Sequence, residues 1–541
     1  MKRALPPRHA VALALLAAAS ACSSGAESTA VASRGVVSAA ADPSASAAEG
    51  PEQGDAQADA IRGGPSPASG DGVQAASGGA AGASSGDATR PMPGLEAAVL
   101  QAPPQASAVP RLLGDFVSPR TTVIYAEPRW GAVLRGRVDP GHPFMAIEAA
   151  VGEGCDELGW ARVQLDGYAC LRHASTSTEP PEPLPRVRDG EILPFVYAKP
   201  KADRKGVLLA EVPRYRSVAH LRRKATPVDN LVGNRQYAFV EFTKRWGGVY
   251  VDGEERAIPA ANMELQKPSE HFGRRLNMSP VADGLTAAWS VSLPAVLVDQ
   301  VGKRAKPIGS IPYHEPVDVD PTPIRAGGET WHRVPGRGKD GADAFVDASQ
   351  IRYWDPGPKW DEAPTRELWI DVDIDQQMLA LRQGDEVLFL TLVSTGTGKH
   401  PTPRGLFRIR NKLALGKMEN RPDEPESYYV EEVPWVQYFY KRFAFHTTYW
   451  HRSLGRRRSH GCINLAPRAA AYIFAQTSPM LPDGWTSAWE YEDAVGTVVR
   501  IRNGDDPMPD KRRPLGDQED EGDEPEPPEA DAADDEPGSG P

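Results

Sequence analysis

Short segments rich in β-branched and aromatic residues follow one another from about residue 121 onward, with turn residues between them. This pattern is typical of strands joined by tight turns, so it predicts a mainly β fold. The first run comprises segments at 121–126, 132–138, 144–149, 160–164 and 167–171. A similar succession of β-like segments and turns returns at residues 297–353. The segment at residues 239–263 has a related ending. We interpret these runs as a loose repeat of small β modules.

The C-terminal part carries the sharpest strand pattern. Apolar residues at the even positions from Leu368 to Ile374 alternate with Trp369 and three aspartates, Asp371, Asp373 and Asp375, which is the period of a half-buried strand. Strands at 378–381 and 387–393 are expected to form a hairpin through Gln383-Gly384-Asp385. A helix is predicted at 468–476 with Pro467 at its start, and a closing strand at 497–501.

Composition divides the 541 residues further, because a chain of this length exceeds one hydrophobic core and suggests about three or four units. Ala, Gly, Ser and Pro dominate residues 23–110, which hold few large apolar side chains. Such a stretch cannot bury enough surface to offset its chain entropy, so we expect a flexible tether. The acidic, Pro-rich end is also expected to be disordered, either as a solvating extension or as a docking element.

The N-terminus is typical of an export signal, with basic residues from Lys2 to Arg8 followed by a short apolar core at 11–21. That core is too short to be a stable membrane-spanning anchor. The sequence Ala19-Ser20-Ala21-Cys22 resembles a bacterial lipoprotein box, which implies lipidation of Cys22 and a membrane anchor. An ordinary cleaved signal peptide is the alternative.

Export implies an oxidising compartment, which sets the expected state of the four cysteines. With Cys22 removed, Cys155 and Cys170 are the natural disulfide pair inside one small domain. Cys462 then has no partner, and a reactive thiol would explain it. The net charge of −12, without a basic stripe interleaved with aromatic residues, argues against a nucleic-acid partner.

Cys462 lies in the segment Ser459-His460-Gly461-Cys462-Ile463-Asn464-Leu465. It could be a nucleophile, a metal ligand or a buried core residue. Zinc sites usually draw their ligands from tight local pairs, and no such pairing links Cys462 with the nearby histidines, so we expect no metal. We favour the nucleophile, because histidines and the cations Arg456 to Arg458 could lower the pKa of the thiol.

Carbonyl chemistry at a thiolate also needs a proton shuttle and donors for the oxyanion. His446 lies far enough before Cys462 for a loop to return it to the thiol as the base. Gly461 would let backbone amides approach the substrate closely. In an extended backbone His460 would share a face with Cys462 and could tune or orient the thiol.

These residues make the chain similar to the L,D-transpeptidase (YkuD-type) catalytic domain. Ser394-Thr395-Gly396 and the run from Pro401 to Ile409 also resemble that family's glycine turn and strand, and the resemblance covers 366–503. It implies a β-sandwich catalytic domain with one or two short helices, no cofactor, and acyl transfer on peptidoglycan stem peptides.

The resemblance also implies roles for single residues. Cys462 would attack the carbonyl of the L-centre of the third stem residue and expel the terminal D-alanine. His446 would take the thiol proton and later assist the incoming amine, while the backbone carbonyl of Thr447 orients its imidazole. His460 and Gly461 would complete the site, and Asn464 matches one common variant of the motif.

Other substrate contacts stay open at this point. Arg458 and its two neighbours could bind stem-peptide carboxylates or form a solvated loop. Tyr449 could shape the acceptor cleft or simply pack. The acceptor could be an amine, which gives crosslinks or protein attachment, or water, which gives a carboxypeptidase or amidase. A wall-binding lipoprotein with a vestigial catalytic domain is a further alternative. Papain-like proteolysis is disfavoured because its cysteine precedes its histidine.

The first β run adds a second resemblance. Gly159-Trp160-Ala161-Arg162-Val163 and Gly167-Tyr168-Ala169-Cys170 resemble a bacterial SH3-like module, which implies wall binding or a mere spacer. The predicted organisation is a signal peptide at 1–21, a tether at 22–110, an SH3-like module at 111–175, a β-rich intermediate region at 176–285, a second SH3-like module at 286–355, the catalytic domain at 366–503 and an acidic tail at 504–541. We expect a periplasmic, lipid-anchored protein of the cell envelope.

Overall fold

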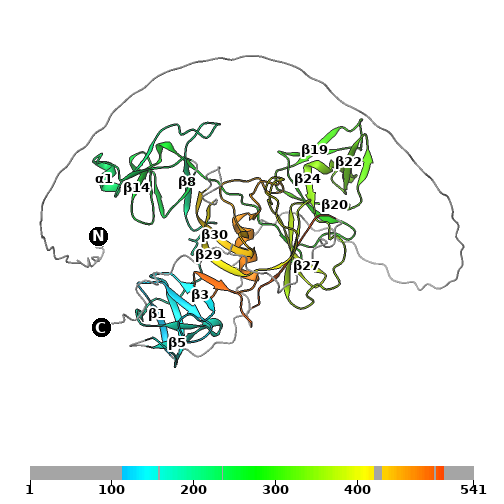
Figure 1. Ribbon diagram of the computed structural model, residues 1–541. Coiled ribbons are helices and arrows are strands. Elements are labelled where there is room, and N and C mark those ends of the chain that lie inside the picture. Colours follow the sequence, from blue (N-terminus) through cyan, green and yellow to red (C-terminus); the bar gives the residue numbers. More distant parts are fainter. Residues whose placement is uncertain (1–112, 156–158, 234, 420–428, 493–494, 505–541) are drawn as a thin grey trace, which may run out of the picture. The chain divides into compact units, whose positions relative to one another are not determined.

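The computed structural model describes residues 113–155, 159–233, 235–419, 429–492 and 495–504 (Figure 1). The predicted signal peptide, the tether, Cys22 and the acidic tail beyond Gly504 lie outside the described residues. Strands dominate the described part, which contains two α-helices. The prediction of a mainly β protein is therefore confirmed. Among the helices described, none is long and apolar enough to cross a membrane.

A first β module, coloured cyan in Figure 1, holds the segments of the first sequence run. Its strands are β1 (Gly114–Val117), β2 (Thr122–Tyr125), β3 (Leu134–Val138), β4 (Pro143–Ala150), β5 (Trp160–Val163), β6 (Tyr168–Cys170) and β7 (Ser175–Thr176). They pair antiparallel in the order β3-β2-β6-β5-β4-β1-β7 around a core that includes Ile124 and Phe144. A disulfide joins Cys155 to Cys170 inside this module.

An intermediate region follows. Its elements are β8 (Val196–Pro200), β9 (Val212–Arg214), α1 (Val218–Arg222), β10 (Asp229–Leu231), β11 (Arg235–Phe239), β12 (Glu241–Thr243), β13 (Val249–Val251), β14 (Ala257–Pro259), β15 (Met263–Leu265) and β16 (Arg274–Arg275). Its own core gathers Tyr237, Phe239, Tyr250 and Ile258. Two of its strands join the C-terminal part: β11 pairs parallel with β30, and β16 pairs antiparallel with β27.

A second β module comes next and consists of two small sheets. Its strands are β17 (Thr286–Ser290), β18 (Ala295–Val298), β19 (Pro307–Ile311), β20 (Pro316–Val319), β21 (Ile324–Ala326), β22 (Glu329–Val334), β23 (Ala344–Asp347) and β24 (Ile351–Tyr353). The sheet orders are β20-β17-β24 and β19-β18-β23-β22-β21. Side chains of both sheets, among them Leu297, Val319 and Ile351, share one apolar core.

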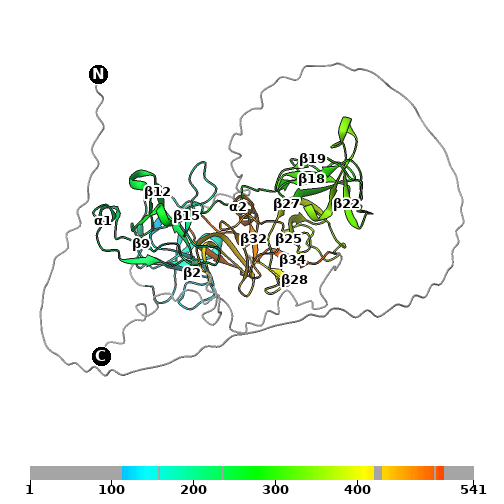
Figure 2. The same cartoon turned by 90° about the horizontal axis from the view of Figure 1, so that it is seen from above.

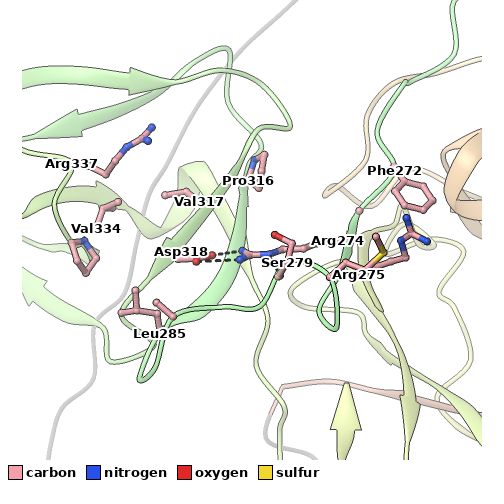
Figure 3. Close-up of a pocket in the computed structure, with 14 residues that line it drawn as sticks. Phe272, Arg274, Arg275, Ser279, Leu285, Pro316, Val317, Asp318, Val334 and Arg337 are labelled. Carbon is pink, nitrogen blue, oxygen red and sulfur yellow. Dashed lines mark hydrogen bonds and ion pairs between the residues drawn. The ribbon is translucent and has the colours of Figure 1, made fainter. Parts of the chain in front are cut away.

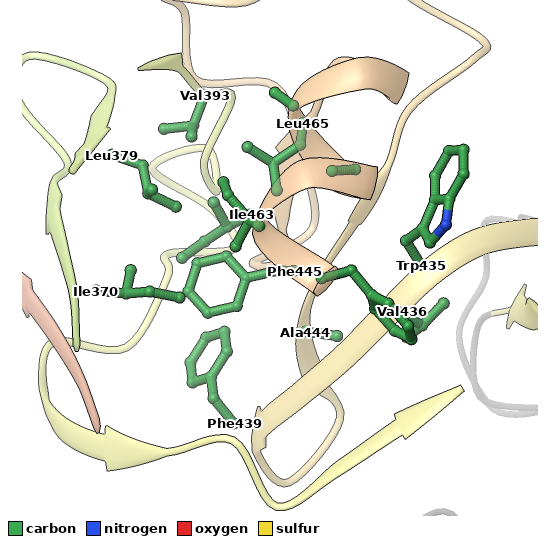
Figure 4. Close-up of a cluster of buried hydrophobic side chains, with 14 of the residues drawn as sticks. Ile370, Leu379, Val393, Trp435, Val436, Phe439, Ala444, Phe445, Ile463 and Leu465 are labelled. Carbon is green, nitrogen blue, oxygen red and sulfur yellow. The ribbon is translucent and has the colours of Figure 1, made fainter. Parts of the chain in front are cut away.

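The C-terminal region contains the predicted hairpin, helix and closing strand. Its elements are β25 (Leu368–Asp373), β26 (Met378–Gln383), β27 (Glu386–Leu392), β28 (Gly405–Arg408), β29 (Asn411–Glu419), β30 (Tyr429–Tyr440), β31 (Phe443–Thr447), β32 (Ile463–Leu465), α2 (Pro467–Gln476), β33 (Ser487–Trp489) and β34 (Val498–Arg502). One sheet runs β16-β27-β26-β25-β34-β28, and the other contains β33-β29-β30-β31-β32. A core that includes Ile370, Phe439, Phe445 and Ile463 lies between them (Figure 4).

Helix α2, which is labelled in Figure 2, packs on β30 and β31. Pro467 occupies its first turn, where the missing N–H leaves no intrahelical bond unmade. At the other end, the buried Lys412 Nζ donates to the carbonyls of Phe474, at 2.6 Å, and of Thr477. This lysine therefore satisfies carbonyls of the last turn, which a helix cannot satisfy by itself.

The prediction that β25 is half-buried is wrong, because this strand is buried on both faces. Parallel pairing with β34 sets Asp371 opposite Arg500 and Asp373 opposite Arg502. Arg500 Nε donates to Asp371 Oδ1 at 3.0 Å, and Arg502 Nη1 donates to Asp373 Oδ2 at 3.0 Å. The aspartates that looked solvent-facing in the sequence thus form buried ion pairs, which are tolerated because each charge has its partner.

Candidate active site

The pairing of β31 with β32 sets the frame of the site. The two strands run parallel, with Phe445 opposite Ile463 and His446 opposite Asn464. Successive side chains of a strand point to opposite faces, and Phe445 and Ile463 point into the core (Figure 4). His446 and Asn464 therefore face the other side. Cys462 immediately precedes β32, so it lies one residue before this register begins.

A tight turn presents Cys462. The Ser459 hydroxyl accepts a hydrogen bond from the Gly461 N–H at 3.1 Å and donates to the Cys462 carbonyl. Gly461 has a φ of +115°, and a Cβ there would lie 2.3 Å from Phe443 Cε1. Glycine is required by this close approach and by the positive φ. Ser459 already engages the Gly461 N–H, so the prediction that Gly461 lets backbone amides approach the substrate concerns other amides and stays a prediction.

A second turn supports the first. The Thr402 hydroxyl accepts from the Gly396 N–H at 2.9 Å and donates to the Gly461 carbonyl at 2.8 Å. Ser394 and Asn464 exchange two backbone hydrogen bonds, at 3.0 and 2.9 Å. The two upstream segments that contributed to the family resemblance in the sequence therefore meet at the turn that presents Cys462. Thr402 lies within one of them, but nothing in the sequence singled it out.

His446 is 2% exposed, and its Nδ1 lies 3.0 Å from the Thr447 carbonyl oxygen. A carbonyl can only accept, so Nδ1 carries the proton and Nε2 keeps its lone pair. Burial lowers the pKa of His446 to about 4, although the bond to Thr447 opposes this shift. The imidazole is therefore neutral near pH 7 and can act as a base. Trp450 stacks on it at 5.7 Å between ring centroids.

Cys462 is a half-buried free cysteine whose Sγ lies 3.7 Å from the Arg442 carbonyl oxygen. Burial raises the pKa of the thiol, and smaller opposing effects come from the Ala444 backbone and from the charge of Arg442. The expected net lowering of this pKa by Arg456 to Arg458 is thus wrong, because the effect of burial is larger than that of the nearby charge. The cation that acts on Cys462 is Arg442, from the β30–β31 turn, and not one of Arg456 to Arg458.

Tyr438 of β30 is a further neighbour that the sequence did not reveal. Burial is the main reason that its pKa rises to about 12, and the proximity of Cys462 adds to the rise. Its phenol therefore stays protonated beside the thiol. Tyr438 and Arg442 come from a hairpin whose strand pattern is visible in the sequence, but only the fold brings that hairpin to Cys462.

His460 does not share a face with Cys462 by strand alternation, because residues 460–462 form a bend and not an extended strand. The side chain is exposed, and its ring centroid lies 4.6 Å from that of His400. The predicted tuning role of His460 therefore lacks the geometry that motivated it.

The expected substrate contact of Tyr449 is wrong. This residue is fully buried, its hydroxyl donates to the Glu431 carbonyl at 2.7 Å, and its ring stacks on Tyr197 at 3.7 Å. Packing, the alternative left open by the sequence, is what the structure shows. The reason is Tyr197 of the intermediate region, which covers Tyr449 from a distant part of the chain.

Asn464 is also buried, at 2% exposure, so a direct substrate contact is not available to it in this arrangement. Its Nδ2 lies 2.9 Å from His451 Nε2. Burial lowers the pKa of His451 to about 3, and the charge of Arg458 contributes. Asn464 and His451 therefore form a neutral pair behind the site.

The three consecutive arginines differ in their contacts. Arg456 donates to the Val291 carbonyl at 2.8 Å, and Arg457 pairs with Asp375 at 2.8 Å. Arg458 is exposed and lies 3.4 Å from the Ser453 hydroxyl, so its predicted role in carboxylate binding stays a prediction. Within the described residues, no three His, Cys, Asp or Glu side chains converge as metal ligands would.

Several known proteins are similar to part of this chain. The putative L,D-transpeptidase YciB of Bacillus subtilis is 23% identical over 131 residues, which are 22% of this chain and 65% of that protein. An L,D-transpeptidase structure from Mycobacterium smegmatis is 22% identical, with a TM-score of 0.21 over 31% of this chain and 76% of its own. The catalytic domain of the L,D-transpeptidase of E. faecium is 22% identical, with a TM-score of 0.20 over 25% of this chain and 98% of its own. The model of one family, the L,D-transpeptidase catalytic domain (YkuD), matches residues 367–501, the segment that holds both His446 and Cys462.

Proposed function

We propose that this protein is a peptidoglycan L,D-transpeptidase, with Cys462 as the nucleophile and His446 as the base. The observation that supports the proposal is the parallel β31–β32 pair, in which the neutral His446 imidazole, with its proton on Nδ1, stands opposite Asn464, two residues after Cys462, the free cysteine among the described residues. Both residues lie in the segment that matches the catalytic-domain family.

The first step forms a thioester. Because the resting pair is a neutral thiol and a neutral imidazole, the proton moves from Sγ to His446 Nε2 as Sγ bonds to the carbonyl carbon of the third stem residue. Negative charge then develops on the carbonyl oxygen. When this intermediate collapses, its C–N bond breaks and the His446 proton goes to the leaving amine of D-alanine.

The second step returns the enzyme to its resting state. An acceptor amine attacks the thioester carbon and loses a proton to His446 Nε2. The C–S bond then breaks, Sγ recovers the proton, and a new amide crosslinks two stems. Arg442, whose charge favours the thiolate, would stabilise Sγ whenever it carries negative charge. With water as the acceptor, the same steps give a carboxypeptidase or an amidase.

Further parts of the proposal rest on the sequence alone. They are the envelope location, lipid anchoring at Cys22 and binding of wall polymer by the β modules. The disulfide of the first module supports an oxidising compartment, since such bonds persist outside the cytosol.

The test uses the purified full-length protein and a disaccharide-tetrapeptide, with the products read by mass spectrometry. Crosslinked dimers indicate transpeptidation, and tripeptide alone indicates hydrolysis. Cys462→Ala should abolish both products while the thermal unfolding midpoint stays within a few degrees of wild type. Absence of both products from the folded wild type, or equal product from Cys462→Ala, would refute the proposal.

A further inference from the structure

The loop at 452–456, between β31 and the nucleophile turn, lies against the second β module. Three polar groups of the module contact loop carbonyls: Tyr313 Oη at 2.9 Å from Arg452 O, His314 Nε2 at 3.2 Å from Leu454 O, and Arg352 Nε at 3.0 Å from Gly455 O. In return, Arg456 of the loop donates to the Val291 carbonyl at 2.8 Å. The module therefore engages four positions of the loop.

Apolar packing also contributes to the contact between the loop and the second module. Leu454 is fully buried in a cluster with Trp289 and Val291 of the module. Gly455 has a φ of +78°, and a Cβ there would lie 2.3 Å from Val291 Cγ1 and 3.5 Å from Arg352 Cγ. The loop backbone thus approaches the module as closely as a glycine allows.

A further contact, which does not involve the loop, joins the module to the C-terminal sheet. Arg274 of β16 forms an ion pair with Asp318 of β20 and donates to the Ser279 carbonyl at 2.7 Å (Figure 3). Because β16 pairs with β27, this arginine links the module to the C-terminal sheet. A cavity of about 790 Å³ lies beside the ion pair and is lined by neither His446 nor Cys462. We therefore interpret the Arg274–Asp318 contact as one that fixes the position of the module and not as part of the reaction site.

The opposite side of the loop is fixed by the C-terminal region. The Gly455 N–H donates to the Val393 carbonyl at 2.8 Å, and the N–H groups of Arg458 and Ser459 donate to the Thr395 carbonyl at 2.8 and 3.0 Å. Ser459 then begins the turn that presents Cys462. The loop is therefore hydrogen-bonded on both sides and leads without a break into the turn that presents Cys462.

We propose that the second β module is a positioning element for catalysis, which holds the loop at 452–456 so that Cys462 stays in register with His446. Arg352 is its principal positioning residue, because it joins the module to Gly455 without reaching the reacting atoms. The inference rests on the proposed function for its turnover readout, but not for its structural readout.

The test compares Arg352→Ala with Arg333→Ala. Arg333 is the matched control, because its ion pairs, to Asp320 at 2.9 Å and to Asp343 at 3.1 Å, stay inside the module. We expect Arg352→Ala to lower kcat by about 10- to 100-fold with KM within about threefold, since small misplacements near a reacting pair cost about that much. Backbone amides at 455–459 should exchange hydrogen faster. Arg333→Ala should change neither quantity by more than about twofold.

Tyr313→Phe removes one hydroxyl and keeps the ring, so it tests the same contact if Arg352→Ala does not fold. It should raise exchange at 452–456 and lower kcat by less than Arg352→Ala does. Wild-type exchange at 452–459 in a folded Arg352→Ala, or equal kcat losses in Arg352→Ala and Arg333→Ala, would overturn the proposal. A wild type without turnover would refute the proposed function instead, and the exchange data would still decide whether the module holds the loop.

Discussion

The two β modules attach to the C-terminal region in different ways. The first module continues a sheet, because β3 pairs with β33, and Trp485 of the C-terminal region fills its core. In that sheet β29 and β30 separate β33 from β31, the strand of His446. The second module instead contacts, through side chains, the loop that leads to Cys462. The first attachment should therefore matter for stability alone, whereas the second should matter for stability and for chemistry.

The largest effect is expected at His446, the proposed base, which belongs to neither module. His446→Gln removes the nitrogen that accepts the thiol proton, and such proton transfer contributes about 10²- to 10⁴-fold to rate. We expect a kcat loss of that size, with hydrogen exchange unchanged in both modules. A variant that keeps more than about a tenth of wild-type turnover would place the base elsewhere.

The next prediction compares the modules directly, through Val291→Ala and Val138→Ala. Both valines are 1% exposed, and each substitution removes the same atoms. Each should lower the free energy of unfolding by about 2 kcal/mol, from lost transfer energy and the cavity left behind. Only Val291→Ala, at the module that contacts Gly455, should also lower kcat, by about tenfold.

The measurement is chemical denaturation together with steady-state kinetics on both variants. Equal kcat losses would mean that stability alone controls turnover and that the modules do not differ. A kcat loss confined to Val138→Ala would reverse the comparison.

The sequence predicted what depends on local patterns. The turn residues Gln383-Gly384-Asp385 predicted the hairpin of β26 and β27, and the Ser-His-Gly-Cys motif singled out Cys462 as the candidate nucleophile. What failed depends on partners distant in the chain. Asp371 is buried against Arg500, 129 residues away, and no period-2 pattern can show that pairing. Tyr449 likewise became a core residue only because Tyr197 covers it.

The prediction of how charges affect the pKa of Cys462 failed for a related reason. The nearest cations in sequence are Arg456 to Arg458, but the hairpin between β30 and β31 brings Arg442 to the thiol instead. Burial, which sequence proximity cannot measure, then outweighs that charge. The motif could single out Cys462 as the candidate nucleophile, whereas the sequence could not show that burial raises the pKa of its thiol.

A third prediction concerns the first module alone. Cys155 and Cys170 are 15 residues apart, and closing a loop of that length restricts the unfolded chain by about 3 kcal/mol in the entropy model. The double variant Cys155→Ser, Cys170→Ser should therefore unfold more readily in the first module, as hydrogen exchange at β3 to β6 would show. Its kcat should stay within about twofold of wild type. A larger kcat loss would show that the first module is also coupled to the site.

The smallest predicted effect is a difference in acid sensitivity. His271 and His314 lie at the seam of the second module, with ring centroids 5.5 Å apart, and burial lowers their pKa values to about 3 and about 4. The nearby charge of Arg452 also lowers the pKa of His314. The proximity of His314 in turn lowers the pKa of His271. When the second module separates from the C-terminal region, both imidazoles become exposed to water. They then bind protons that their low pKa values exclude while the module is in contact. Docking is therefore fully stable above about pH 6.5 and weakens as the pH falls toward 4.

Hydrogen exchange, corrected for its intrinsic pH dependence, should show this between pH 7 and pH 4.5. Protection at 452–459 should fall before protection at β3 and β33. Earlier loss of protection at β3 would contradict the assignment.

The covalent intermediate on Cys462 tests the central claim most directly. Wild-type protein is mixed with disaccharide-tetrapeptide, quenched in acid within one turnover and digested, and the peptides are mapped by mass. We predict an adduct of the substrate minus D-alanine on the peptide that contains Cys462, and no adduct in Cys462→Ala. Product formation with the adduct on another residue, or with no adduct while Cys462→Ala remains active, would contradict the account.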